Sequence, residues 1–193
     1  VLHDKNALEA VLNASGNSGI TAGGNLLVSG TTNDLTTTTT NGGTTTFGDT
    51  TVNGNLDSKS DGAITQTDKI VVAGTTTLDA GTNDITLNNP TNDFQSTVNA
   101  SGKNVALSDA NGLELGDVTA TGTLGASAVN DITQKAGTAI TATGATTLAS
   151  SSGDITLDNP NNDFQSTVNA SGKNIVLHDK NALEAVLNAS GNS

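Results

Sequence analysis

The chain has 193 residues, of which one third are hydrophobic and only three, all Phe, are aromatic, so a broad globular core is hard to build from it. Seven Lys, no Arg and 19 acidic residues give a net charge of −12, which disfavours binding to nucleic acids and to anionic membrane surfaces. No apolar run approaches the ~20 residues that a membrane-spanning helix needs. Val, Ile and Leu spaced among Thr, Asn and Gly indicate many short strands joined by tight turns.

The first segment of the chain, VLHDKNALEAVLNASGNS at residues 1–18, returns letter for letter at residues 176–193. This recurrence indicates one full period of a longer tandem polymer plus an overlap, with another Ile before Val1 and another Gly after Ser193. We therefore expect residues 1–193 to form one continuous segment, in which 1–18 and 176–193 hold the same repeat position.

Within this segment, NALEAVLNAS has the composition of a helix, because Ala, Leu and Glu are good helix formers. Its relative at residues 111–120, NGLELGDVTA, contains Gly112, Gly116 and Asp117, which interrupt a helix, and a Val and a Thr that favour a strand. Aligned segments of one repeat should share one conformation. The alignment therefore predicts a strand over residues 7–12.

Short apolar triplets recur along the rest of the chain, and most of the intervals between them match the length of one solenoid coil. They begin at Leu26, Ile64, Ile85, Val105, Ile132, Ile155 and Ile175. The Thr-rich stretch around residues 44–47 fits as a degenerate marker in the one gap that is nearly double. Eight coils of about 22 residues per 175-residue period predict an all-β fold, a parallel β-solenoid.

Residues 84–105 and 154–175 form an internal repeat with a 70-residue offset and only three substitutions. Pro90 and Pro160 occupy equivalent turn positions, and Phe94 and Phe164 are expected to point inward at a corner, where each can bury a large apolar area. The continuation of the repeat, 106–122 against 176–192, preserves a Leu, an Asp, an Asn, a Leu and a Glu while much else changes.

We assign no catalytic and no metal-binding residues in this sequence. His3 and His178 are the same repeat position, each before an Asp, but the aligned residue at 108 is Ser and no second His lies near, so we expect surface residues. Nothing resembles a nucleophile elbow or a phosphate loop. We therefore expect no enzyme activity and no cofactor; a polysaccharide-acting enzyme would need converging carboxylates with a basic partner.

Two patterns leave alternatives open. Carboxylates recur in the repeat, and solenoids can bind calcium between coils, but the Gly-Gly-x-Gly-x-Asp pattern of calcium-binding β-rolls is absent and Asp is common in turns; these residues are Asp84, Asp93, Asp154, Asp158 and Asp163. The Asn-Ala-Ser sequences match the N-glycosylation pattern, which arises readily in a chain rich in Asn, Ser and Thr; they begin at Asn13, Asn99, Asn169 and Asn188.

The stretches DITL.N..NDF, NV.L.DAN.L.LG.V.ATG.L and [AD]ITQ resemble the degenerate repeats of filamentous-haemagglutinin-like exoproteins, which are large bacterial adhesins often exported by two-partner secretion. The likeness covers residues 60–193 well and residues 20–58 poorly. It implies a right-handed parallel β-helix that serves as a rod at the cell surface or in an extracellular matrix.

We therefore expect a structural repeat segment of an extracellular bacterial fibre or adhesin stalk, which associates with other copies end to end, with lateral association left open. The alternative is a surface-binding module that uses the Thr-rich face around residues 35–52 to contact polysaccharide, such as surface glycans, or ice. The Thr runs are clustered in one or two coils instead of recurring on every coil, which counts against ice binding.

Overall fold

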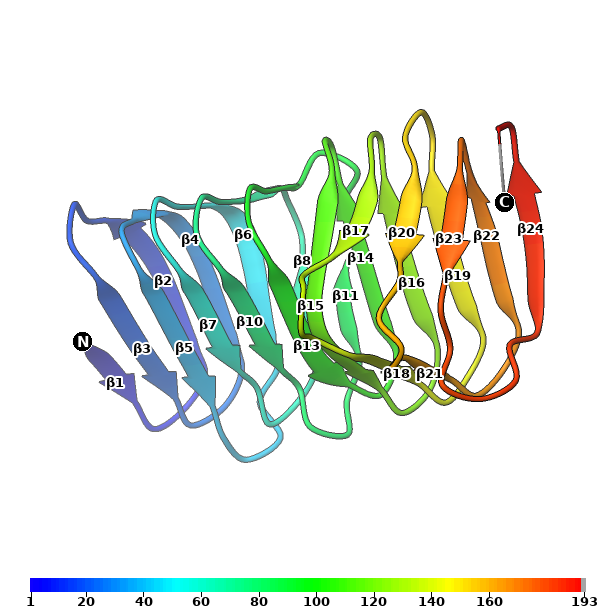
Figure 1. Cartoon of the computed structure of the whole chain (residues 1–193). Coiled ribbons are helices and arrows are strands. Elements are labelled where there is room, and N and C mark those ends of the chain that lie inside the picture. Colours follow the sequence, from blue (N-terminus) through cyan, green and yellow to red (C-terminus); the bar gives the residue numbers. More distant parts are fainter. Residues whose placement is uncertain (192–193) are drawn as a thin grey trace.

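The computed structural model describes residues 1–191, and these residues contain strands and no helix. The chain winds into a solenoid with two parallel sheets of 12 strands each, sheet A and sheet B, and its first and last strands lie at opposite ends (Figure 1). Each coil adds its strands to both sheets; Leu56, for example, pairs with Leu35 of the coil before and Thr76 of the coil after. The predicted fold class, a β-solenoid with parallel strands, is confirmed.

Consecutive strands mostly alternate between the sheets, although in four places two consecutive strands lie in the same sheet. Sheet A contains β1 (Leu2–Asp4), β3 (Ser18–Ala22), β5 (Leu35–Thr39), β7 (Leu56–Lys59), β10 (Thr76–Asp79), β13 (Val98–Gly102), β15 (Leu113–Ala120), β17 (Ile132–Gln134), β18 (Ile140–Ala142), β20 (Ile155–Leu157), β21 (Asp163–Phe164) and β23 (Ile175–Leu177). Sheet B contains β2 (Leu8–Asn13), β4 (Leu26–Thr32), β6 (Thr45–Val52), β8 (Ile64–Gln66), β9 (Ile70–Val72), β11 (Ile85–Leu87), β12 (Asp93–Phe94), β14 (Val105–Asp109), β16 (Leu124–Ala128), β19 (Thr146–Ser150), β22 (Val168–Gly172) and β24 (Ala185–Ala189).

The solenoid has about nine coils of about 20 residues, one coil more than the eight longer coils expected from the sequence. The reason for the difference is that the apolar markers do not stay in one sheet. Val105 lies in sheet B and the next marker, Ile132, lies in sheet A, so the chain between them makes one and a half coils instead of one. The expected additional coil between Leu26 and Ile64 is present as β6.

The 70-residue repeat changes sheets from one copy to the next. Ile85 and Phe94 of the first copy lie in sheet B, whereas their equivalents Ile155 and Phe164 lie in sheet A. Between Ile85 and Ile155 the chain makes seven half-coils, which is an odd number. Successive copies of the repeat are therefore rotated by half a turn about the solenoid axis.

The core is a narrow column between the sheets, built from alternate residues of each strand. Leu35, Leu56 and Val98 are fully buried in sheet A, and so are Ile64 and Ile85 in sheet B, because side chains at every second position of a strand point to the same face. Phe94 and Phe164 are only 2% and 3% exposed, which confirms that both rings point inward. Pro90 and Pro160 lie in turns between strands, as expected.

The segment 7–12 is extended, as the alignment predicted, and forms most of β2. In the duplicate segment, residues 182–187, the last three lie in β24, which belongs to the same sheet as β2. Ala10 of β2 pairs with Val28, and Leu187 of β24 pairs with Ala170, so both copies add a strand to sheet B. Residues 192 and 193, the last of the second copy, lie outside the described residues.

Candidate functional site

A polar corner with several carboxylates occurs once in each 70-residue repeat. The first corner joins β12 to the turn after β14, where the carboxylate of Asp109 accepts two backbone N–H groups. Phe94 N donates to Asp109 Oδ2 at 2.7 Å, and Asn111 N donates to Asp109 Oδ1 at 2.6 Å. An Asp that accepts the N–H two residues ahead closes a tight turn, and its second oxygen fastens this turn to the coil before it.

A second carboxylate lies at the surface of the same corner. Asp93 Oδ2 accepts the side-chain Nε2–H of Gln95 at 2.8 Å, and Asp93 Oδ1 accepts Nδ2–H of Asn111 at 3.1 Å. Both amide groups thus hold the Asp93 side chain in one orientation. Glu114 lies beside this group in β15 and accepts a hydrogen bond from the hydroxyl of Thr97.

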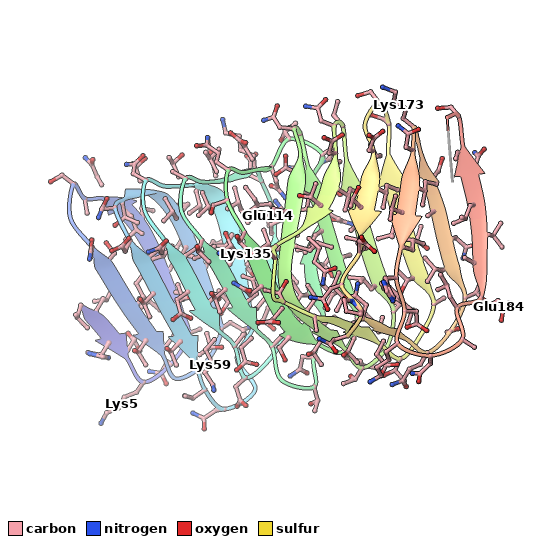
Figure 2. All side chains as sticks on the ribbon, viewed as in Figure 1. Lys5, Lys59, Glu114, Lys135, Lys173 and Glu184 are labelled. Carbon is pink, nitrogen blue, oxygen red and sulfur yellow. The ribbon has the colours of Figure 1, made fainter. Side chains whose placement is uncertain are left out.

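The second corner repeats this geometry on the other sheet. Phe164 N donates to Asp179 Oδ1 at 2.9 Å, and Asp163 accepts the amides of Gln165 and Asn181 at 2.8 and 3.0 Å. The hydroxyl of Thr167 donates to Glu184 at 3.0 Å. Figure 2 shows Glu114 near the middle of the rod and Glu184 at its C-terminal end.

The two corners differ in one charge. Lys180 Nζ lies 3.0 Å from Asp163 Oδ2 in the second corner, whereas the equivalent position in the first corner is Ala110. The ammonium group of Lys180 covers its partner, so Asp163 is buried while Asp93 is half-buried. Asp93 forms no ion pair within residues 1–191.

Two carboxyl groups of the corners, at positions that are not equivalent in the repeat, have pKa values shifted in opposite directions. Burial raises the pKa of Asp109, the hydrogen bonds from Phe94 and Asn111 lower it, and the nearby charge of Asp93 raises it further, leaving a net upward shift. The hydrogen bond from Gln165, followed by the interactions with Lys180, lowers the pKa of Asp163. The first corner therefore holds Asp93, Asp109 and Glu114 with no ion pair to any of them among residues 1–191, whereas in the second corner Lys180 pairs with Asp163.

A cavity opens at each corner. The first has a volume of about 590 Å³, and its lining includes Asp93, Gln95, Asn111 and Glu114. The second has a volume of about 340 Å³ and is lined by Gln165, Asn181 and Glu184 among others, but not by Asp163. Asp93 thus lines the first cavity, whereas its equivalent Asp163 does not line the second and instead pairs with Lys180.

The histidines are exposed, as expected of surface residues. His3 lies in the terminal strand β1, and His178 Nδ1 lies 3.4 Å from Asp158 Oδ1, with both side chains about half exposed or more. No group of three or more His, Asp or Glu side chains that could hold a metal ion occurs in the part of the chain that the structure describes. Among residues 1–191, no helix is long and apolar enough to span a membrane.

The other carboxylates and the Asn-Ala-Ser residues lie apart from the corners. Asp84 and Asp154 each accept hydrogen bonds from the backbone and side chain of an Asn in the next coil, Asn104 and Asn174 respectively. Asn99 accepts the backbone N–H of residue 117 at a β-bulge. Three of the Asn-Ala-Ser asparagines are exposed; they are Asn13, Asn169 and Asn188.

The Thr-rich stretch 35–52 does not gather its threonines on one face. Thr36 lies on the outside of sheet A, whereas Thr46 lies on the outside of sheet B. Thr37, Thr45 and others point into the core and are buried. The stretch therefore supplies only a few outward hydroxyls to each sheet.

Sequence reasoning did not identify Asp109, Asn111 or Glu114 as parts of one site. A signal was present, since the alignment of 106–122 with 176–192 preserves these three residues. The alignment did not reveal that Asp109 contacts the Asp93–Phe94 pair of the preceding coil, because this contact depends on how many residues the coil between them contains.

A family model described as "Repeats of unknown function (DUF5649)" matches residues 33–101 and again residues 102–171. No curated protein and no solved structure matches the chain. The first matched unit makes four passes through sheet A and three through sheet B, and the second makes three and four. The junction lies inside β13, and both sheets continue across it.

Proposed function

Since the chain belongs to this family of repeats of unknown function, we propose that it is a structural segment of an extracellular bacterial fibre or adhesin stalk. The observation that carries the proposal is the absence of a break between the two matched units among residues 33–171. Val98 of β13 pairs with Thr76 of one coil and Leu115 of the next, so the repeats are continuous and not separate domains. Such a rod gains length and stability coil by coil.

Other copies of the repeat are the proposed partners, added end to end. Strands β1 and β2 at one end, and β23 and β24 at the other, each pair on one side only within the described residues. A parallel strand with free N–H and C=O groups is a template for the next coil. Further repeats, in the same chain or in another copy, can therefore extend both sheets at these edges.

We propose that this rod is extracellular and that it is neither an enzyme nor dependent on a cofactor. The resemblance of the repeats to filamentous-haemagglutinin-like exoproteins supports an extracellular rod, and the composition without Cys is compatible with export. We propose that the rod has no enzyme activity and needs no cofactor to fold, since its core is formed by the apolar side chains of the two sheets.

Two measurements test this function. Electron microscopy of one, two and three fused 175-residue periods should show rods that lengthen by about 43 Å per period, because nine coils rise about 4.8 Å each. Antibodies against the chain should label intact cells of the bacterium that makes it. Labelling only after lysis, or fused periods that form separate globules, would rule out the extracellular rod.

A further inference from the structure

Asp93 of the first corner and Asp163 of the second are equivalent carboxylates, and they differ in whether a counterion is present. Asp93 and Asp163 accept the same two side-chain amides with nearly the same distances, 2.8 and 3.1 Å against 2.8 and 3.0 Å. Only Asp163 also contacts an ammonium group, that of Lys180. The second corner thus shows that a carboxylate held by these two amides can pair with a lysine ammonium group.

The remaining binding capacity of Asp93 suits an ammonium group. Each of its oxygens already accepts one amide N–H. A guanidinium fork favours two free carboxylate oxygens side by side, whereas an ammonium group is a compact charge that needs one. Calcium takes six to eight oxygen ligands, and no group of three or more acidic or His residues suitable for a metal is found within residues 1–191.

We propose that the first corner binds a lysine side chain of a partner protein, whose ammonium group lies against Asp93 as Lys180 lies against Asp163. The 590 Å³ cavity, with Asp93, Asn111 and Glu114 in its lining, leaves room for the aliphatic part of such a lysine side chain. This interaction goes beyond the structural role of the rod. The net charge of −12 favours a basic partner over a second copy of this acidic chain.

The test is a nuclear magnetic resonance titration of the folded chain with the peptide acetyl-Gly-Ser-Lys-Ser-Gly-amide, observing the side-chain amides of Gln95 and Asn111. Saturable shifts are expected at these amides and not at Gln165 and Asn181. The peptide with norleucine in place of lysine should cause none. Asp93→Asn keeps the shape and removes the charge, and should weaken binding by about fivefold, which corresponds to one exposed ion pair.

Exchanging the residue that differs between the corners gives the matched controls. Ala110→Lys should supply the ammonium in cis and abolish peptide binding at Gln95 and Asn111. Lys180→Ala should create peptide-dependent shifts at Gln165 and Asn181. Both variants are expected to fold, since the two corners already tolerate either residue, and circular dichroism with an unchanged β spectrum checks this.

Several results would overturn the proposal. Equal shifts at both corners of the unmodified chain, or binding unaffected by Ala110→Lys, would mean general attraction to an acidic rod. Stronger binding of putrescine than of the peptide would identify a free diamine as the ligand, and saturation by calcium chloride alone would identify a metal site. Concentration-dependent shifts at Gln95 without peptide would identify a second copy as the source of the lysine.

Discussion

Phe94 and Phe164 hold the same position in consecutive repeats, yet they lie in opposite sheets of the solenoid. Phe94 pairs with Val72 in sheet B, and Phe164 pairs with Ala142 in sheet A. A repeat of seven half-coils must exchange the sheets at each copy, because an odd number of half-turns ends on the other face. Any side chain of the repeat is therefore presented alternately on the two faces of the rod.

This alternation predicts distances between spin labels. Thr77 and Thr147 are equivalent residues in sheets A and B, separated by three and a half coils, whereas Thr65 and Thr147 both lie in sheet B, separated by four coils. Cysteine substitutions and nitroxide labels at both pairs can be compared by electron paramagnetic resonance. The first pair should be about 10 Å farther apart, because its labels point outward from opposite sheets, although it is closer along the axis. A shorter or equal distance would contradict the half-turn relation.

Replacing Phe164 by Ala should lower the free energy of unfolding by about 3–5 kcal/mol, because a buried aromatic side chain is removed and a cavity remains. Phe94→Ala should have a similar effect. Urea denaturation followed by circular dichroism measures both, with Phe164→Leu as a control that keeps much of the apolar volume and should cost less. A loss below about 1 kcal/mol would mean that the ring does not anchor its coil.

Thr76→Val and Thr146→Val should stabilise the protein. Their hydroxyls are buried without a hydrogen-bond partner among the described residues, and Val has the same shape without the polar atom. We expect a gain of about 1 kcal/mol in the free energy of unfolding. The matched control is Thr37→Val, since Thr37 Oγ1 donates to Ser58 Oγ at 2.8 Å and its loss should destabilise. Destabilisation by Thr76→Val would indicate that this hydroxyl has a partner.

Acid should weaken the second corner through Asp163. The hydrogen bond from Gln165 and the interactions with Lys180 lower its pKa in the folded state below the ordinary value of 3.8. Its contribution is therefore present above pH 3.8 and is lost as the pH falls through the lower folded value. Asp163→Asn should reduce stability near neutral pH and flatten the acid limb of a plot of unfolding free energy against pH. Asp57→Asn, at an exposed carboxylate, serves as the control for the loss of one surface charge.

The strands, the turns and the inward-pointing residues could be predicted from the sequence alone. The aligned relative at 111–120 overruled the helix propensity of residues 7–12, and β2 has the predicted strand conformation. The shared repeat position of Phe94 and Phe164 indicated inward rings, and both are buried. These features follow from local preference and from the alternation of side chains along a strand, which can be read from neighbouring residues.

The tertiary structure decided which sheet each strand joins and which distant residues meet. Ile85 and Ile155 stand in nearly identical sequences but lie in different sheets, because side-chain alternation distinguishes inside from outside and not one sheet from the other. Coils also differ in length: the coil closed by the pairing of Ser18 with Leu35 is shorter than the coil closed by the pairing of Ile132 with Ile155. These differences in coil length add up along the chain and determine which sheet a later strand joins. The contacts of Asp109 with Phe94 and of Lys180 with Asp163 depend on that closure, since each joins residues of neighbouring coils.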